Sequence, residues 1–261
     1  MKEIKVIVAT HKKYEMPKNQ LYLPLQVGKA GKEYLGYETD DTGKNISEKN
    51  SLYCELTALY WAWKNLDSDY IGLVHYRRYF SKSSFPMFAK NKYDHIISDS
   101  DITSFLAENK VIVPKKRNYY IESIYSHYAH THYAEHLDKS LEIIKKKYPK
   151  YEASFESVMK STSAHMFNMF IMSKENLDLY CQWLFDILFE LENVVDISEY
   201  SDFQKRYLGR VSEILFNVWL KENTIEVKEL PYLYLGKVKV FSKGISFLRA
   251  KFQKKKFDRS F

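Results

Sequence analysis

The sequence predicts an α/β protein built as a single domain around a mostly parallel central sheet. Two observations support this prediction. Short apolar segments alternate with amphipathic helical patterns along most of the 261 residues, which is the pattern of parallel strands joined by helices. The segment Tyr70–Val74 is a continuous apolar run, too short for a helix and typical of a strand buried on both faces. A chain of this length can also bury a substantial core.

The first half of the chain is expected to begin with a strand near Lys5–Ala9. A long irregular region follows over residues 15–50, and its segment 40–47 is dense in side chains that bond hydroxyl and backbone groups. We interpret this segment as a ligand-binding loop, because long loops inside a compact domain are usually functional or disordered. A helix is then expected from about Ser51 to Asn65. Glu55 lies in its first turns, and the simplest interpretation is that its negative charge stabilises the N-terminus of the helix.

The remaining elements are predicted from the same periodicities. In chain order they are a short strand at His95–Ile97, a helix capped by Ser98 or Asp99, a strand at 111–114, a helical region at 119–146, a buried strand within 163–173, and helices at 174–190 and 202–220. Four histidines fall between residues 127 and 136. No cysteine or carboxylate stands at metalloprotease spacing near them, so a hydrogen-bonding role is favoured over a metal site.

Charged and aromatic side chains directly follow the Tyr70–Val74 strand. They are His75, Tyr76, Arg77 and Arg78. Ligands of open α/β sheets bind outside the carboxyl ends of the strands, so two adjacent arginines there indicate a site for an anionic group such as phosphate. The alternative is that both arginines pair with carboxylates at the edge of the core.

The distribution of charge excludes some classes of protein. The net charge is +7, but residues 237–261 alone hold nine Lys or Arg residues against one acidic residue, so the rest of the chain is nearly neutral. A diffuse nucleic-acid-binding surface is therefore disfavoured. The sequence has no signal-peptide pattern and no membrane-spanning apolar run. Cys54 and Cys181 stand in no metal or redox spacing and are expected to be reduced thiols of a cytoplasmic protein.

Four motifs are the most specific part of the sequence. They are Ala9-Thr10-His11-Lys12, then Asp41-Thr42-Gly43 with Asn45-Ile46-Ser47 and Asn50, then the run from Cys54 to Asn65, and His75-Tyr76-Arg77-Arg78-Tyr79-Phe80. Together they resemble a bacterial family of capsular and exopolysaccharide glycosyltransferases, long catalogued as domain of unknown function 4422. The resemblance covers roughly residues 3–230. It implies a GT-A-like, Rossmann-like fold and transfer of a sugar, galactofuranose in some members, from a nucleotide-diphosphate donor such as a UDP-sugar to a lipid-linked glycan.

The resemblance also implies a donor site and a catalytic base. We expect the donor to be bound by Thr10, His11, Asp41, Asn45, Glu55, His75, Tyr76, Arg77 and Arg78. If the reaction inverts the anomeric centre, as we expect, a side chain must take the proton of the acceptor hydroxyl. The candidates are Glu213, Asp202 and His132. Glu213 comes first because it shares a helix turn with Arg206 and Arg210, although that spacing also fits an intrahelical ion pair.

The expected diphosphate site departs from the usual GT-A pattern. GT-A enzymes usually hold a divalent metal on two aspartates after the central strand. Here that position is His75-Tyr76-Arg77, so we expect cationic side chains to stabilise the leaving diphosphate instead. The competing possibility is Mg²⁺ or Mn²⁺ bound by Asp40 or Asp41. The alternative function is a non-catalytic sugar- or nucleotide-binding scaffold of a polysaccharide assembly complex.

Residues 237–261 are expected to form a separate membrane-association segment, after a glycosyltransferase domain at residues 1–236. Their apolar residues form one helical stripe with cations around it: Phe241, Ile245, Leu248 and Phe252. Anionic lipid attracts such a segment by about 1 kcal/mol per cation near the surface. The segment would thus hold the enzyme at the inner face of the membrane, beside a lipid-linked acceptor. The alternative is that the stripe packs on the rest of the protein.

We predict that the full chain co-sediments with anionic liposomes but not with neutral ones. Deletion of residues 237–261 is expected to abolish this binding, because it removes all of the excess positive charge together with the apolar stripe. Equal sedimentation of the truncated and intact proteins would exclude this segment as the anchor.

Overall fold

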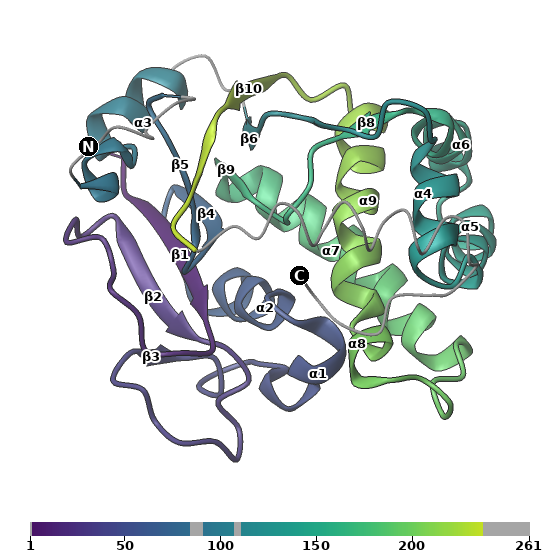
Figure 1. Cartoon of the computed structure of the whole chain (residues 1–261), viewed down its shortest axis with the longest axis horizontal. Helices are drawn as coiled ribbons and strands as arrows, with labels where there is room; N and C mark the ends of the chain where they lie inside the picture. The colour runs from purple at the N-terminus through teal and green to yellow at the C-terminus, as the bar shows by residue number, and fades with distance from the viewer. Residues whose placement is uncertain (1, 84–90, 107–110, 237–261) are drawn as a thin grey trace.

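A sheet of nine strands organises the residues that the computed structural model describes, which are 2–83, 91–106 and 111–236 (Figure 1). Its main strand order is β10-β6-β9-β4-β1-β2-β3. The bounds are β1 Ile4–Thr10, β2 Tyr22–Gln26, β3 Glu38–Thr39, β4 Tyr70–His75, β5 Arg78–Phe80, β6 Val111–Pro114, β9 Phe170–Ser173, β10 Val227–Leu230 and β11 Tyr232–Tyr234.

The sheet is mostly parallel, as the sequence predicts. Strands β3, β2, β1 and β4 run parallel to one another, and β10 runs parallel to β6. Strand β9 is antiparallel to both of its neighbours, β4 and β6. After β4 the chain turns back into β5, which also pairs with β11 in the antiparallel sense.

Strands β1 and β4 are inner strands of this sheet. They pair with each other from Ile4 opposite Tyr70 to Ala9 opposite His75, with β2 on one side and β9 on the other. Their β-branched side chains are buried on both faces of the sheet. The predictions for Lys5–Ala9 and Tyr70–Val74 are therefore confirmed, and the carboxyl ends of these two strands lie side by side.

Helices and short strands complete the fold. The helices are α1 Asn50–Tyr53, α2 Leu56–Asn65, α3 Asp99–Leu106, α4 Ile124–Thr131, α5 Glu135–Lys147, α6 Glu152–Lys160, α7 Lys174–Val194, α8 Asp202–Lys205 and α9 Tyr207–Glu222. Strands β7 (Arg117–Asn118) and β8 (Ser163–Ala164) form a separate pair. One hydrophobic core joins the sheet to α2, α7 and α9, and a second core on the opposite face involves α3, β5 and β11.

Two predicted helices are each broken about one turn after their start. The helix expected from Ser51 is interrupted at Cys54, whose φ is +54°, and the one expected over residues 202–220 is interrupted at Arg206. The two breaks face each other, because Arg206 Nε donates to Cys54 Sγ at 3.1 Å. Figure 1 shows α1 beside α8 and the start of α9.

Other boundaries also differ from the prediction. The strand predicted at His95–Ile97 is wrong, because residues 92–95 form a 3₁₀ helix and Ile96 makes only an isolated bridge to Ser81. The buried strand predicted within 163–173 is split into β8 and β9 by a turn. The predicted C-terminal helical appendage at 237–261 lies outside the described residues. Among the helices that are described, none is long and apolar enough to cross a membrane.

Candidate active site

The candidate active site lies at the carboxyl ends of β1 and β4, on the face of the sheet covered by α2 and α9. His75 is the last residue of β4, and its Nε2 forms a hydrogen bond with the carbonyl oxygen of Phe167 in the turn between β8 and β9. Burial lowers the pKa of His75, so the ring is neutral near pH 7. A neutral ring that donates from Nε2 to a carbonyl is fixed in one tautomer and orientation.

Asn168 connects the elements around His75. Its Nδ2 donates to Glu55 Oε1 at 2.7 Å, just before α2, and to the carbonyl oxygen of Gly209 in α9 at 2.9 Å. Its Oδ1 accepts a hydrogen bond from Ser212 Oγ at 2.9 Å. Phe167 and Asn168 both have positive φ, +78° and +50°, and such consecutive left-handed residues are costly unless the surroundings hold them. The turn is thus held in a strained shape that joins β4, α2 and α9.

Glu213 on α9 is the carboxyl group of this site with the most perturbed acidity. Desolvation and, second, the nearby charge of Glu55 raise its pKa to about 7. A hydrogen bond from the backbone of Phe167 and the charges of Arg78 and Arg117 act in the opposite direction. Glu213 is therefore able to accept a proton near neutral pH, which is the property required of a general base.

Arg77 and Arg78 stack on aromatic rings. The Cζ of Arg77 lies 4.8 Å from the ring centre of Tyr76, and the Cζ of Arg78 lies 4.7 Å from that of Phe167 and 5.3 Å from that of Tyr234. Within the described residues, no carboxylate lies within 4.0 Å of either guanidinium. The alternative in which both arginines pair with core-edge carboxylates is thus not found, and their hydrogen-bonding edges suit an incoming anion.

Two further arginines extend this positive region, and both approach it from the α8–α9 junction. Besides its contact with Cys54, Arg206 helps Arg77 to lower the pKa of His11, which reaches about 4 mainly through desolvation. Arg210 donates to the carbonyl oxygen of Phe203 at 2.7 Å, while its other terminal nitrogen is buried without a hydrogen-bond partner. Neither guanidinium lies within 4.0 Å of Glu213, so the alternative of an intrahelical ion pair is not found in this described helix.

The sequence-predicted donor residues fall into two groups. His11, Glu55, His75, Tyr76, Arg77 and Arg78 lie together, with the His11 and Tyr76 rings in edge contact at 5.3 Å. Thr10 is fully buried, and its hydroxyl donates to the carbonyl oxygen of Lys12 at 2.6 Å. The side-chain hydrogen bonds of Asn45 stay within its own loop, and Asp41 lies 4.0 Å from Lys29. In the described structure, Asp41 and Asn45 form no hydrogen bond or ion pair with the arginines.

The other two candidate bases lie in different surroundings. Asp202 is exposed at the start of α8. His132 is buried, its Nδ1 lies 3.0 Å from Gln204 Oε1, and burial holds its pKa well below the ordinary value. A buried histidine in a hydrogen bond fits a structural role. Of the three candidates, Glu213 therefore has the chemistry that best suits a base.

Of the two acidic residues offered as metal ligands, Asp40 is already engaged by hydrogen bonds, whereas Asp41 lies 4.0 Å from Lys29. Asp40 is fully buried, and its carboxylate accepts hydrogen bonds from the backbone N–H groups of Gly28 at 2.7 Å and Lys29 at 3.0 Å and from Ser47 Oγ. Its role is to hold the turn after β2, where Gly28 has a φ of +59°. Among the described residues, no three His, Cys, Asp or Glu side chains are grouped to hold a metal ion. The oxygens of Asp40 are therefore already occupied by the groups of this turn.

The histidines between 127 and 136 take hydrogen-bonding roles, as the sequence favours. His127 and His130 both contact the buried Glu122 through Nδ1, at 3.1 and 2.8 Å. His136 Nδ1 lies 2.8 Å from the hydroxyl of Tyr128. These contacts join α4 to the loop before it and to α5.

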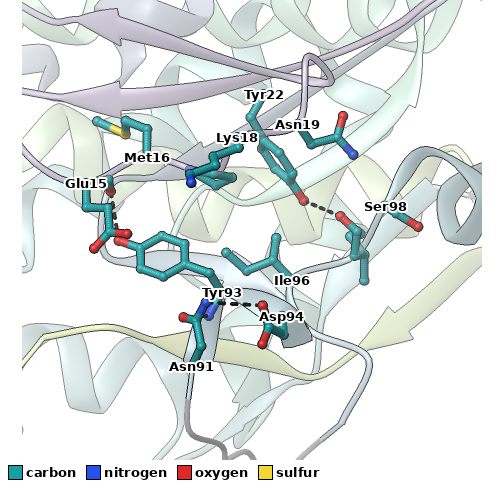
Figure 2. Close-up of a pocket in the computed structure, with 12 residues that line it drawn as sticks. Glu15, Met16, Lys18, Asn19, Tyr22, Asn91, Tyr93, Asp94, Ile96 and Ser98 are labelled. Carbon is teal, nitrogen blue, oxygen red and sulfur yellow. Dashed lines mark hydrogen bonds between the residues drawn. The ribbon is translucent and has the colours of Figure 1, made fainter.

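A separate pocket of about 390 Å³ lies between the 15–19 segment and residues 91–98 (Figure 2). Tyr22 and Tyr93 cross it, with their hydroxyls donating to the carbonyl oxygens of Ile97 at 2.9 Å and Glu15 at 2.8 Å. Its lining holds one lysine, no arginine and none of the predicted site residues. The pocket is therefore distinct from the anion site at β4.

Comparisons with known proteins agree with this fold. A family model described as "Domain of unknown function (DUF4422)" matches residues 5–224. None of the curated proteins matches the chain. Among solved structures, the chain is similar to the apo structure of a bifunctional glycosyltransferase, WbbM, with a TM-score of 0.80 and 30% identity over 90% of this chain and 46% of that chain. The chain thus spans about half the length of that protein, and the predicted GT-A-like fold is confirmed.

We predict that Glu213→Gln stabilises the fold at about pH 8. The folded-state pKa of Glu213, about 7, lies above its ordinary value of 4.5, so the unfolded chain releases this proton first as the pH rises. The folded state therefore loses stability between these two values, by about 3 kcal/mol at most. Glutamine keeps the shape of the protonated acid and removes this loss.

Urea unfolding at about pH 8 and about pH 5 measures this effect. The gain should shrink toward the lower pH, where the folded wild-type carboxyl is protonated. Glu142→Gln, on the surface of α5, is the matched control and should change little at either pH. A Glu213→Gln protein that is less stable than the wild type at about pH 8 would show that the carboxylate is not penalised by burial.

Proposed function

The chain belongs to the family described as domain of unknown function 4422, and we propose that it is a glycosyltransferase that moves a sugar from a nucleotide-diphosphate donor to a glycan acceptor. One observation carries the proposal. A carboxyl group with a pKa of about 7, Glu213, stands near arginines that have no carboxylate partner in the described structure. The fold is also similar to that of a bifunctional glycosyltransferase.

The arginines would act on the leaving group. As the bond between the anomeric carbon and the diphosphate breaks, negative charge develops on the departing phosphate oxygens. Arg77 and Arg78, with Arg206 opposite them, would stabilise that charge in place of a metal ion. A guanidinium that is not already paired with a carboxylate is more effective in this role, since the stabilisation then costs no broken ion pair.

Glu213 would act on the acceptor. Its carboxylate would take the proton of the acceptor hydroxyl while that oxygen forms a bond to the anomeric carbon, on the side opposite to the departing diphosphate. This direct displacement inverts the anomeric configuration. A pKa of about 7 suits the task, since a general base works best when its pKa lies near the working pH. The charge of Glu55, held by Asn168, keeps this pKa high.

The substrates follow from the family resemblance. We propose a UDP-sugar donor, with galactofuranose as the first sugar to test, and a lipid-linked oligosaccharide acceptor in capsule or exopolysaccharide synthesis at the cytoplasmic face of the membrane. The decisive experiment measures release of nucleoside diphosphate from a panel of activated sugars, with and without such an acceptor. Donor binding without release from any of them would favour the non-catalytic scaffold instead.

We predict that Arg77→Ala and Arg78→Ala each lower turnover by about one to three orders of magnitude, because each removes a contact that strengthens as the diphosphate leaves. Lys146→Ala on α5, which removes a surface cation, is the control and should leave turnover unchanged. Near-normal turnover in both arginine variants would reject their role.

Strong chelation should leave the wild type active, whereas a loss restored by Mn²⁺ would reject the replacement of a metal by arginines.

We also predict a pH profile that reports on Glu213. In the wild type, kcat/KM should rise about tenfold per pH unit below pH 7 and level off above it, because the base must be deprotonated and its pKa is about 7. Glu213→Gln should lose at least about a hundredfold in turnover together with this acid limb. Unchanged turnover and donor affinity in Glu213→Gln would assign the proton transfer to another group.

A further inference from the structure

Tyr120 and Ile121 form an exposed apolar tip on the loop between β7 and α4. Their side chains are 84% and 82% exposed, more than any other large apolar side chain in the described part of the chain. Other exposed residues of this kind, such as Leu179, occur singly, which is ordinary for a protein surface. Two adjacent exposed apolar side chains at the tip of a loop instead indicate a surface that contacts another molecule.

The loop holds this tip in a fixed shape. Tyr120 has a φ of +57°, and the carbonyl oxygen of Tyr119 accepts hydrogen bonds from the backbone N–H groups of Ile121 at 2.8 Å and Glu122 at 3.3 Å. The N–H of Tyr119 donates to the carbonyl oxygen of Thr162 at 2.8 Å. A left-handed tyrosine in a hydrogen-bonded turn costs free energy, and here it directs two apolar side chains into solvent.

Positive charge lies directly beside the tip. Lys115, Lys116 and Arg117 precede it, and all three are exposed. Exposed apolar and aromatic side chains next to a group of cations are typical of segments that enter the interfacial layer of an anionic membrane. Tyrosine in particular favours this layer, because its ring is apolar and its hydroxyl is polar.

The same loop borders the candidate base. The Cζ of Arg117 lies 5.2 Å from the ring centre of Tyr119, and the charge of Arg117 acts on Glu213. Tyr119 in turn contacts the ring of His127 at 4.2 Å between ring centres. The tip and Glu213 therefore lie on the same part of the molecule, with Arg117 and Tyr119 within electrostatic range of Glu213.

We propose that Tyr120 and Ile121 insert into the interfacial layer of an anionic bilayer, with Lys116 and Arg117 among the lipid headgroups. This contact orients the protein so that Glu213 faces the membrane surface, where a lipid-linked acceptor presents its sugar. The part of this inference in which Glu213 meets the acceptor sugar rests on the proposed function. The insertion itself does not, and it is measured without turnover.

A fluorescent label at the tip tests the insertion. Cys54 and Cys181 are buried, so a thiol-reactive, polarity-sensitive dye should label Tyr120→Cys selectively in the full chain. We expect its emission to rise and shift to shorter wavelength with phosphatidylglycerol vesicles but not with phosphatidylcholine vesicles. The matched control is Leu179→Cys on α7, a position that is 57% exposed, whose label should not respond.

A second variant tests the contribution of charge. Lys116→Ala should weaken vesicle binding about fivefold, the effect of one cation near an anionic surface. Both labelled proteins contain residues 237–261, so binding through that segment is common to them and does not imitate insertion of the tip.

The inference is overturned if the protein co-sediments with anionic vesicles while the label at position 120 stays unchanged, or if no vesicle binds the protein. If nucleoside diphosphate is released but the fluorescence of the label does not change, the insertion is rejected and the proposed function stands. A responsive label without any such release would support the insertion and reject the proposed function.

Discussion

The hydrogen bonds of the Asn168 side chain are the interaction on which the candidate site depends. They join the residue before α2, the first turns of α9 and the turn that receives His75. All of these groups are buried or partly buried, so an unmade bond would cost about 1–3 kcal/mol for each polar group left without a partner. The positions of Glu55 and Glu213 are therefore set by the fold before any ligand binds, which is the preorganisation that electrostatic catalysis requires.

Like charges are held close together in this site, and that arrangement is unfavourable in the protein alone. After desolvation, the charge of Glu55 raises the pKa of Glu213, and the charges of Lys12, Arg206 and Arg77 lower that of His11. A structural ion-pair network would instead alternate the signs of neighbouring charges. Two acidic groups beside arginines that have no carboxylate partner in the described structure fit a reaction in which an anion leaves and a proton is removed. In the proposed function, binding of the donor diphosphate would offset the repulsion among the basic groups.

The sequence predicts the parts of this fold that depend on local pattern. Short apolar runs predict strands β1 and β4. The rule that ligands bind at the carboxyl ends of parallel strands predicts an anion site at the arginines after β4. The breaks at Cys54 and Arg206 could not be predicted, because each depends on a contact with the other, 152 residues away in the chain. Asn168 falls inside the segment predicted as a buried strand within 163–173, and its bonds to Glu55 and Gly209, far away in the chain, leave no local signal. Asp40 appears as a metal ligand in the sequence, yet its partners are backbone N–H groups that only the folded turn provides.

The histidines of the site separate its two electrostatic functions. Burial and neighbouring arginines lower the pKa of both His11, to about 4, and His75. Both rings are then neutral near pH 7, so in the proposed function the positive charge offered to a diphosphate would come from guanidinium groups, which stay charged there. Glu213, with a pKa of about 7, changes charge within the same range. In the proposed function, the histidines would therefore add no titrating positive charge to the donor site near neutral pH, and Glu213 would be the group whose charge changes there.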